Sequence, residues 1–175
     1  NPNHTFLVGR ALYEVGEVDR SAPLVESVLE TQPTHSEALY YLGLIRDERG
    51  EVGPATEAFL RARELDLEQP PPPWALSREA FELKARAAVL SIKDELKAFL
   101  RDGEVYVTDV PGVEVVVDGV DPRALLLLDG VAGDAPGDPP KARVFVYQRN
   151  VERVAGPLDQ VEEEIAAALE REITV

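Results

Sequence analysis

The pattern of apolar and polar positions in the first half of the chain repeats after 34 residues. Shifted by that distance, apolar residues fall on apolar ones, as Val25 does on Phe59, and small residues fall on small ones, as Ser21 does on Ala55. Identical residues also coincide: Gly9 with Gly43, Gly16 with Gly50, Glu17 with Glu51, Val18 with Val52, and Glu30 with Glu64. Because the matching positions are those at which the two helices of a hairpin touch, we predict two helical hairpins that turn at Gly16 and Gly50.

These hairpins need neighbours. A single helical hairpin cannot bury its apolar face, so the hairpins of a repeat pack against one another. Two units are fewer than the roughly three that such arrays need. We therefore expect the end of the stack to be covered, either by further repeats before Asn1 or by the helix that follows the second unit.

The second half of the chain opens and closes with helical patterns. One helix is expected over residues 77–90. A second is expected from Ser91, which forms a capping-box pattern with Asp94, to about Leu100. A final helix is expected from Pro157, since proline is favoured in the first turn of a helix.

Between these helices, three runs have the composition of β-strands: residues 104–110, 113–119 and 143–148. Residues 121–130 are consistent with a short helix or a buried turn, and residues 131–141 have the composition of a loop. The order helix, helix, strand, strand, loop, strand, helix is typical of an α+β domain with a small sheet.

The sequence "EQPPPPW" separates the two halves. Four consecutive prolines cannot lie inside a helix and favour a stiff, extended linker. We therefore predict two helical hairpins in residues 1–69, a proline-rich linker in residues 70–76, and an α+β domain in residues 77–175.

The first half resembles the tetratricopeptide repeat, most clearly in its second unit at Leu39, Leu42, Gly43, Gly50, Ala55, Phe59 and Ala62. In that family the first helices of the repeats line a groove that binds peptides or proteins. The resemblance implies a groove formed by Phe6, Arg10, Tyr13, Tyr40, Leu44 and Asp47. The alternative is that Phe6 and Tyr40 simply pack against neighbouring helices.

The charge of the chain limits its partners. Its formal net charge is -15, and the first 69 residues carry 6 basic and 13 acidic side chains. Neither half has a basic patch, so we expect no nucleic-acid partner and no anionic membrane partner. The sequence contains no Cys, which excludes disulfides and thiolate metal sites, and no apolar run has the length of a membrane span. We expect a cytoplasmic protein.

The final helix carries an unusual residue and an incomplete motif. Val161, Ile165 and Leu169 fall on one apolar stripe, and Glu172 falls in the middle of it. In the zinc-protease motif H-E-x-x-H, two histidines four residues apart bind zinc and the glutamate activates the bound water. Arg171 and Val175 occupy the positions of those histidines, with Glu172 in the position of the glutamate.

Residues 77–175 as a whole resemble the minimal bacterial zincin-like metallopeptidase domain. The similarity lies in "VYVTDVPG", "LLLLDGVAG" and above all "VFVYQRNVER", followed by "EEEI" before the motif. The resemblance implies a zincin-like fold, but a guanidinium cannot donate a lone pair to a metal. Residues 70–175 also contain no His that could substitute. We therefore expect a pseudo-enzyme with no bound metal, no cofactor and no catalytic residue, in which Glu172 is a relic paired with a group such as Arg149 or Arg153.

Three functions remain open at this point. The first is a non-catalytic interaction protein that holds a protein or peptide. The second is an active metallopeptidase or other hydrolase whose functional groups are not recognised here. The third is an architectural module of a larger bacterial protein, in which the repeats only dock onto their own second domain.

Overall fold

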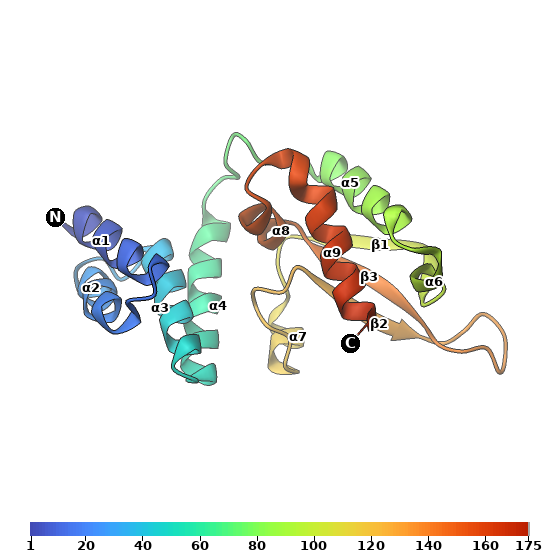
Figure 1. Ribbon diagram of the computed structural model, residues 1–175, viewed down its shortest axis with the longest axis horizontal. Coiled ribbons are helices and arrows are strands. Elements are labelled where there is room, and N and C mark those ends of the chain that lie inside the picture. Colours follow the sequence, from blue (N-terminus) through green and yellow to red (C-terminus); the bar gives the residue numbers. More distant parts are fainter. Residues whose placement is uncertain (175) are drawn as a thin grey trace. The chain divides into compact units, whose positions relative to one another are not determined.

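The computed structural model describes residues 1–174 and has a mixed α+β architecture. The chain divides into two compact units, Asn1–Pro71 and Pro72–Val175, which we call unit 1 and unit 2. Unit 1 contains helices, and unit 2 combines helices with a small sheet (Figure 1).

Unit 1 is built from two helical hairpins. Its helices are α1 (Pro2–Glu14), α2 (Val18–Thr31), α3 (Ser36–Glu48) and α4 (Val52–Glu68). Helices α1 and α3 begin 34 residues apart, as do α2 and α4. Both hairpins turn through a glycine with positive φ, 86° at Gly16 and 75° at Gly50, a backbone conformation that glycine adopts without steric cost. The two predicted hairpins and their turns are confirmed.

The helices of each hairpin approach closely at a glycine. A Cβ atom on Gly9 would lie 3.2 Å from Cγ2 of Val25, and one on Gly43 would lie 2.6 Å from the ring of Phe59. In the first hairpin the buried Ser21 hydroxyl also donates a hydrogen bond of 2.6 Å to the carbonyl of Gly9. The small residues that repeat in the sequence therefore set the spacing between the helices.

The two hairpins share one core. Helix α2 contributes the buried Ala22, Val25 and Val28, while α3 contributes Ala38 and Ile45. At the rim of this interface, the guanidinium of Arg49 lies 3.2 Å from the carboxylate of Asp19. Each hairpin thus buries apolar surface that it could not bury alone.

Unit 2 contains a three-stranded sheet. Its elements are α5 (Arg78–Ser91), α6 (Asp94–Lys97), β1 (Leu100–Thr108), α7 (Val113–Val117), β2 (Leu126–Val131), β3 (Lys141–Tyr147), α8 (Gln148–Ala155), a 3-10 turn (Leu158–Gln160) and α9 (Val161–Thr174). The strand order is β1-β3-β2, with β1 parallel and β2 antiparallel to the central β3.

Helices α5 and α9 pack together against one face of this sheet (Figure 1). The core between the layers includes Phe81 of α5, Ile165 and Leu169 of α9, and Val144 and Val146 of β3. The alternate residues point to the other face, where Tyr106 of β1 and Phe145 of β3 stack with their ring centroids 5.2 Å apart. The result is a two-layer α+β unit.

Two sequence expectations for the sheet are wrong. Residues 113–119 were expected to form a strand because of their valines, but Val113–Val117 form the short helix α7, in which Val116 is buried and Val113 and Val117 are exposed. Strand propensity reflects packing within a sheet, and this run lies outside it. Residues 121–130 were expected to be a short helix or a buried turn but contain all of β2 except its last residue, Val131. The run of leucines in β2 is at least half-buried, so it lacks the alternation of a one-sided strand.

The helix boundaries of unit 2 also differ from expectation. Ser91 ends α5, and its hydroxyl donates to the carbonyl of Ala88 instead of capping a new helix. The helix expected from Ser91 is the single turn α6. Helix α8 follows β3 directly and was not expected, and the final helix starts at Val161 after a 3-10 turn.

The longest described helix, α4, has 17 residues. Within residues 1–174, no helix combines the length and the apolarity that crossing a membrane requires.

Two glycine substitutions test the close approach inside the second hairpin. Alanine favours a helix over glycine by up to about 1 kcal/mol, so Gly53→Ala in α4, where a Cβ meets open space, should raise the free energy of unfolding by up to that amount. Gly43→Ala gains the same propensity but drives Cβ into the ring of Phe59, and should lower the free energy by about 1–3 kcal/mol. Urea unfolding followed by circular dichroism measures both; equal effects would contradict the close approach.

Candidate functional site

The six residues of the expected groove lie on α1 and α3, but they differ in accessibility. Phe6 is buried and belongs to the core between the hairpins, so it is a packing residue. Tyr13, Tyr40 and Leu44 are half-buried, while Arg10 and Asp47 are exposed. The accessible part of the predicted site therefore consists of Arg10, Tyr13, Tyr40, Leu44 and Asp47, which we call the α1/α3 face.

Tyr41 joins the aromatic residues of this region. Its buried ring lies 5.8 Å from Phe6, 5.5 Å from Tyr13 and 6.0 Å from Tyr40, measured between ring centroids. The guanidinium carbon of Arg10 lies 5.8 Å from its centroid, within the range of a cation–π interaction. The first hairpin thus holds the second through Tyr41, a residue that the sequence pattern did not single out although it stands beside Tyr40.

The phenol of Tyr41 also forms a polar contact between the hairpins. It donates a hydrogen bond of 2.6 Å to Oε1 of Glu14 at the end of α1. Burial of the ring, followed by this hydrogen bond, raises the pKa of Tyr41 to about 12, although the positive charge of Arg10 acts in the opposite direction. The contact therefore requires the neutral phenol.

The end of α9 does not resemble a buried catalytic centre. The prediction that Glu172 lies within the apolar stripe is wrong, because Glu172 and Arg171 are exposed. The buried stripe is Val161, Ile165, Ala168 and Leu169, and the half-buried Ile173 continues it. Ile173, four residues after Leu169, packs against the core, whereas Glu172, four residues after Ala168, is exposed in the last turn of the helix. Glu172 needs no buried partner there; Arg149, one suggested partner, has its Nε 3.8 Å from Asp109. Val175 lies outside the described residues.

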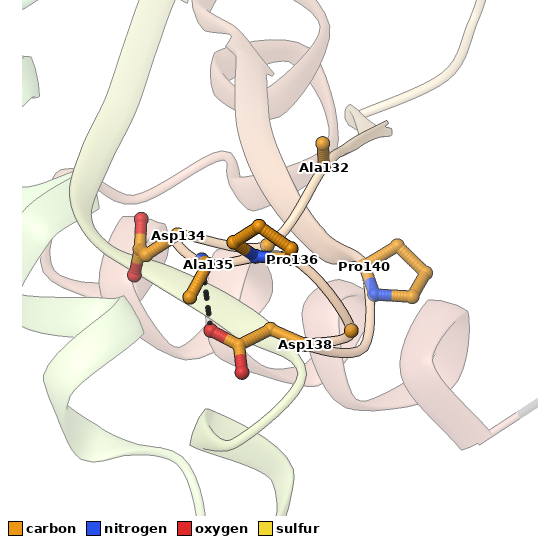
Figure 2. Close-up of a pocket in the computed structure, with 8 residues that line it drawn as sticks. Ala132, Asp134, Ala135, Pro136, Asp138 and Pro140 are labelled. Atoms are coloured by element: carbon orange, nitrogen blue, oxygen red, sulfur yellow. Dashed lines mark hydrogen bonds between the residues drawn. The ribbon is translucent and has the colours of Figure 1, made fainter.

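Other acidic residues of unit 2 are engaged in loop structure. Figure 2 shows the shallow hollow within residues 132–140, where the carboxylate of Asp138 accepts a hydrogen bond of 3.0 Å from the backbone N–H of Ala135. Asp134 lies 3.7 Å from Arg101 and 3.9 Å from Lys141. In the part of the chain that the structure describes, no three His, Asp or Glu side chains gather closely enough to hold a metal ion.

A polar cluster lies where the parallel strands β1 and β3 end. Arg78 donates to the carbonyl of Val107 at 2.8 Å and to Asp109 at 2.7 Å. Gln148 donates to the carbonyl of Leu76 at 2.9 Å, and Asn150 donates to the carbonyls of Pro122 and Ala124 at 2.9 and 2.7 Å. Most of these bonds end on backbone carbonyls, so the cluster fixes loops rather than binding a ligand. The segment "VYQRN" contains Gln148 and Asn150, but its sequence does not reveal that these side chains bond to backbone carbonyls far away along the chain.

Comparison of the chain with models of protein families and with curated proteins finds no match.

A pH titration tests the role of Tyr41. Because its pKa is raised above the ordinary value of 10.0, the folded state favours the neutral phenol. Stability is retained below pH 10 and falls as the pH rises toward 12, by about 2 kcal/mol. Tyr41→Phe should be about 1 kcal/mol less stable than wild type at pH 8, because it loses the bond to Glu14, but should lack this alkaline loss.

Denaturant unfolding of both proteins at several pH values between 8 and about 12 measures the difference. Burial and the nearby Glu114 also raise the pKa of Tyr147 in unit 2, but that effect is common to both proteins and cancels. A gap between wild type and Tyr41→Phe that stays constant across this range would contradict the prediction.

Proposed function

We propose that this chain is a non-catalytic interaction protein: a tetratricopeptide-like pair of hairpins, followed by a zincin-like domain that has lost its metal ligands. Its work is to bind a protein or peptide segment on the α1/α3 face of unit 1. The observation that carries the proposal is the 34-residue spacing of the hairpins, which have turn glycines at equivalent positions and a close approach at Gly9 and Gly43.

The composition of the α1/α3 face supports a peptide ligand. It combines half-buried aromatic rings, Tyr13 and Tyr40, with exposed charges of both signs, Arg10 and Asp47. Aromatic side chains contribute large apolar contact areas, while charged groups fix the register of a bound segment. The packing of Tyr41 beneath Tyr13 and Tyr40 holds these rings in place before a ligand arrives.

The second unit supports a binding role rather than catalysis. The order of elements in this unit follows the order in the zincin-like family: β1, the Pro111-Gly112 turn, the leucine run of β2, β3 and the final helix. The exposed Arg171 stands at a ligand position and carries a charge that repels a cation. The exposed Glu172 lies in no closed cavity that could desolvate a reacting water.

A matched pair of double variants tests the α1/α3 face. Peptides selected from a random library against the whole protein should bind at least about tenfold more weakly to Arg10→Ala/Asp47→Ala, because that variant removes both exposed charges of the face. The control Arg61→Ala/Glu64→Ala removes one charge of each sign from the exposed surface of α4 and should bind normally. Fluorescence anisotropy measures the affinities. Equal binding to both double variants, or no selected peptide at all, would refute the proposed site.

Metal content tests the proposed loss of catalysis. After dialysis against zinc and removal of the excess, the wild-type protein should retain far less than one zinc ion per chain. The variant Arg171→His/Val175→His restores both histidines beside Glu172 and should gain zinc affinity, which shows that the elemental analysis can detect a site. Stoichiometric zinc in the wild-type protein would sink this part of the proposal and call for a peptidase assay.

A further inference from the structure

The first turn of α3 is capped by a histidine side chain. His35 directly precedes the helix, and its Nδ1 atom accepts a hydrogen bond of 3.0 Å from the backbone N–H of Ala38. This position is usually occupied by serine, threonine, aspartate or asparagine, whose side-chain oxygens accept from the same backbone groups. Ala38 is completely buried, so water does not readily replace the imidazole as the acceptor for its N–H.

The cap requires a neutral imidazole. A backbone N–H can only donate, so the hydrogen bond from Ala38 leaves Nδ1 of His35 without a proton. Protonation would turn Nδ1 into a second donor facing that N–H, which would lose its acceptor. The positive charge would also stand at the N-terminus of α3, where the helix dipole disfavours cations. Both effects oppose protonation of His35 in the native state.

The first hairpin has an equivalent cap that does not titrate. Asn1 lies 34 residues before His35, and its Oδ1 atom accepts a hydrogen bond of 3.0 Å from the backbone N–H of Asn3. The side-chain amide of asparagine is not among the groups that exchange protons near neutral pH. The two hairpins therefore start with equivalent caps, and of these only the cap of α3 depends on pH.

His35 also takes part in the contact between the hairpins. Its ring centroid lies 4.7 Å from that of Phe6 on α1, and Phe6 in turn lies 5.8 Å from Tyr41 on α3. Phe6 is buried in the core that the two hairpins share. A change at the cap of α3 therefore reaches the aromatic contact that joins α1 and α3.

Other groups act on His35 in both directions. The helices of unit 1 bring these charged or titratable residues toward this end of α3: His4 and Arg10 of α1, Glu30 of α2, Glu37 of α3, and Arg63 and Asp66 of α4. The acidic residues and a cation–π contact with Phe6 favour a proton on His35, whereas the basic residues oppose it. None of them gives the N–H of Ala38 a new acceptor. Charge interactions between solvent-accessible groups are weak, so the loss of the cap decides the balance.

We propose that His35 is a pH-sensitive switch in unit 1: mild acid protonates its imidazole, uncaps α3 and weakens the contact between the two hairpins. Histidine side chains ordinarily take up a proton at about pH 6.5, so the switch acts around that pH. The unfolded chain binds this proton freely, whereas the capped native state does not. The contribution of the cap to stability is therefore complete above this pH and is lost as the pH falls below it.

The test compares the wild-type protein with His35→Asn, which keeps a capping side chain but cannot take up a proton. Urea unfolding followed by circular dichroism gives the folding equilibrium constant of each protein at about pH 7.5 and about pH 5. Between these values the constant of the wild type should fall about tenfold relative to that of His35→Asn. One proton that the native state excludes completely would give roughly thirtyfold. His35→Ala, which lacks a cap, should have a constant about fivefold below that of His35→Asn at both pH values.

The other histidine of the chain supplies the control. His4→Asn changes an exposed residue of α1 and should leave the pH dependence of the wild type unaltered. Carboxylates that titrate near the acid end are common to all variants, so their effect cancels. His35→Ser, which also caps without titrating, replaces His35→Asn if the latter does not fold. A wild-type constant that changes by less than about twofold relative to His35→Asn would overturn the proposal, and so would an equal loss of pH dependence in His4→Asn.

Discussion

A helical hairpin exposes apolar residues on more sides than its own two helices can cover, and unit 1 is organised by this constraint. Within a hairpin, glycine and serine at the helix crossing let the two helices pack closely, and Ser21 donates a hydrogen bond to the carbonyl of Gly9. The contact between hairpins is satisfied by Tyr41, whose ring meets Phe6 and Tyr13 and whose hydroxyl reaches Glu14. What two hairpins cannot satisfy is the outer side of α1 and of α4, and apolar residues remain exposed there.

The sequence predicted unit 1 better than unit 2, for a physical reason. In this repeat each position occurs twice. Because Gly16 and Gly50 occupy equivalent positions, the amino-acid pattern alone predicts a turn at both. In unit 2 each element occurs once and depends on distant partners. The valines of 113–117 have strand propensity, yet β3 pairs with β1 and β2 and leaves this run outside the sheet. The leucines of β2 lack alternation because the strand is at least half-buried along its leucine run.

The sequence predicted most residues of the candidate site but not how deeply each of them is buried. Helical spacing places Phe6, Arg10 and Tyr13 on one side of α1, but it does not say how far the next hairpin reaches over that side, and Phe6 lies beneath it. The sequence analysis did not identify Tyr41, because the 34-residue period aligns it with Leu7, which is not aromatic. Glu172 was misplaced because a projection at 100° per residue puts it at the centre of the stripe, but it lies in the last turn of α9, where Ile173 packs against the core and Glu172 is exposed.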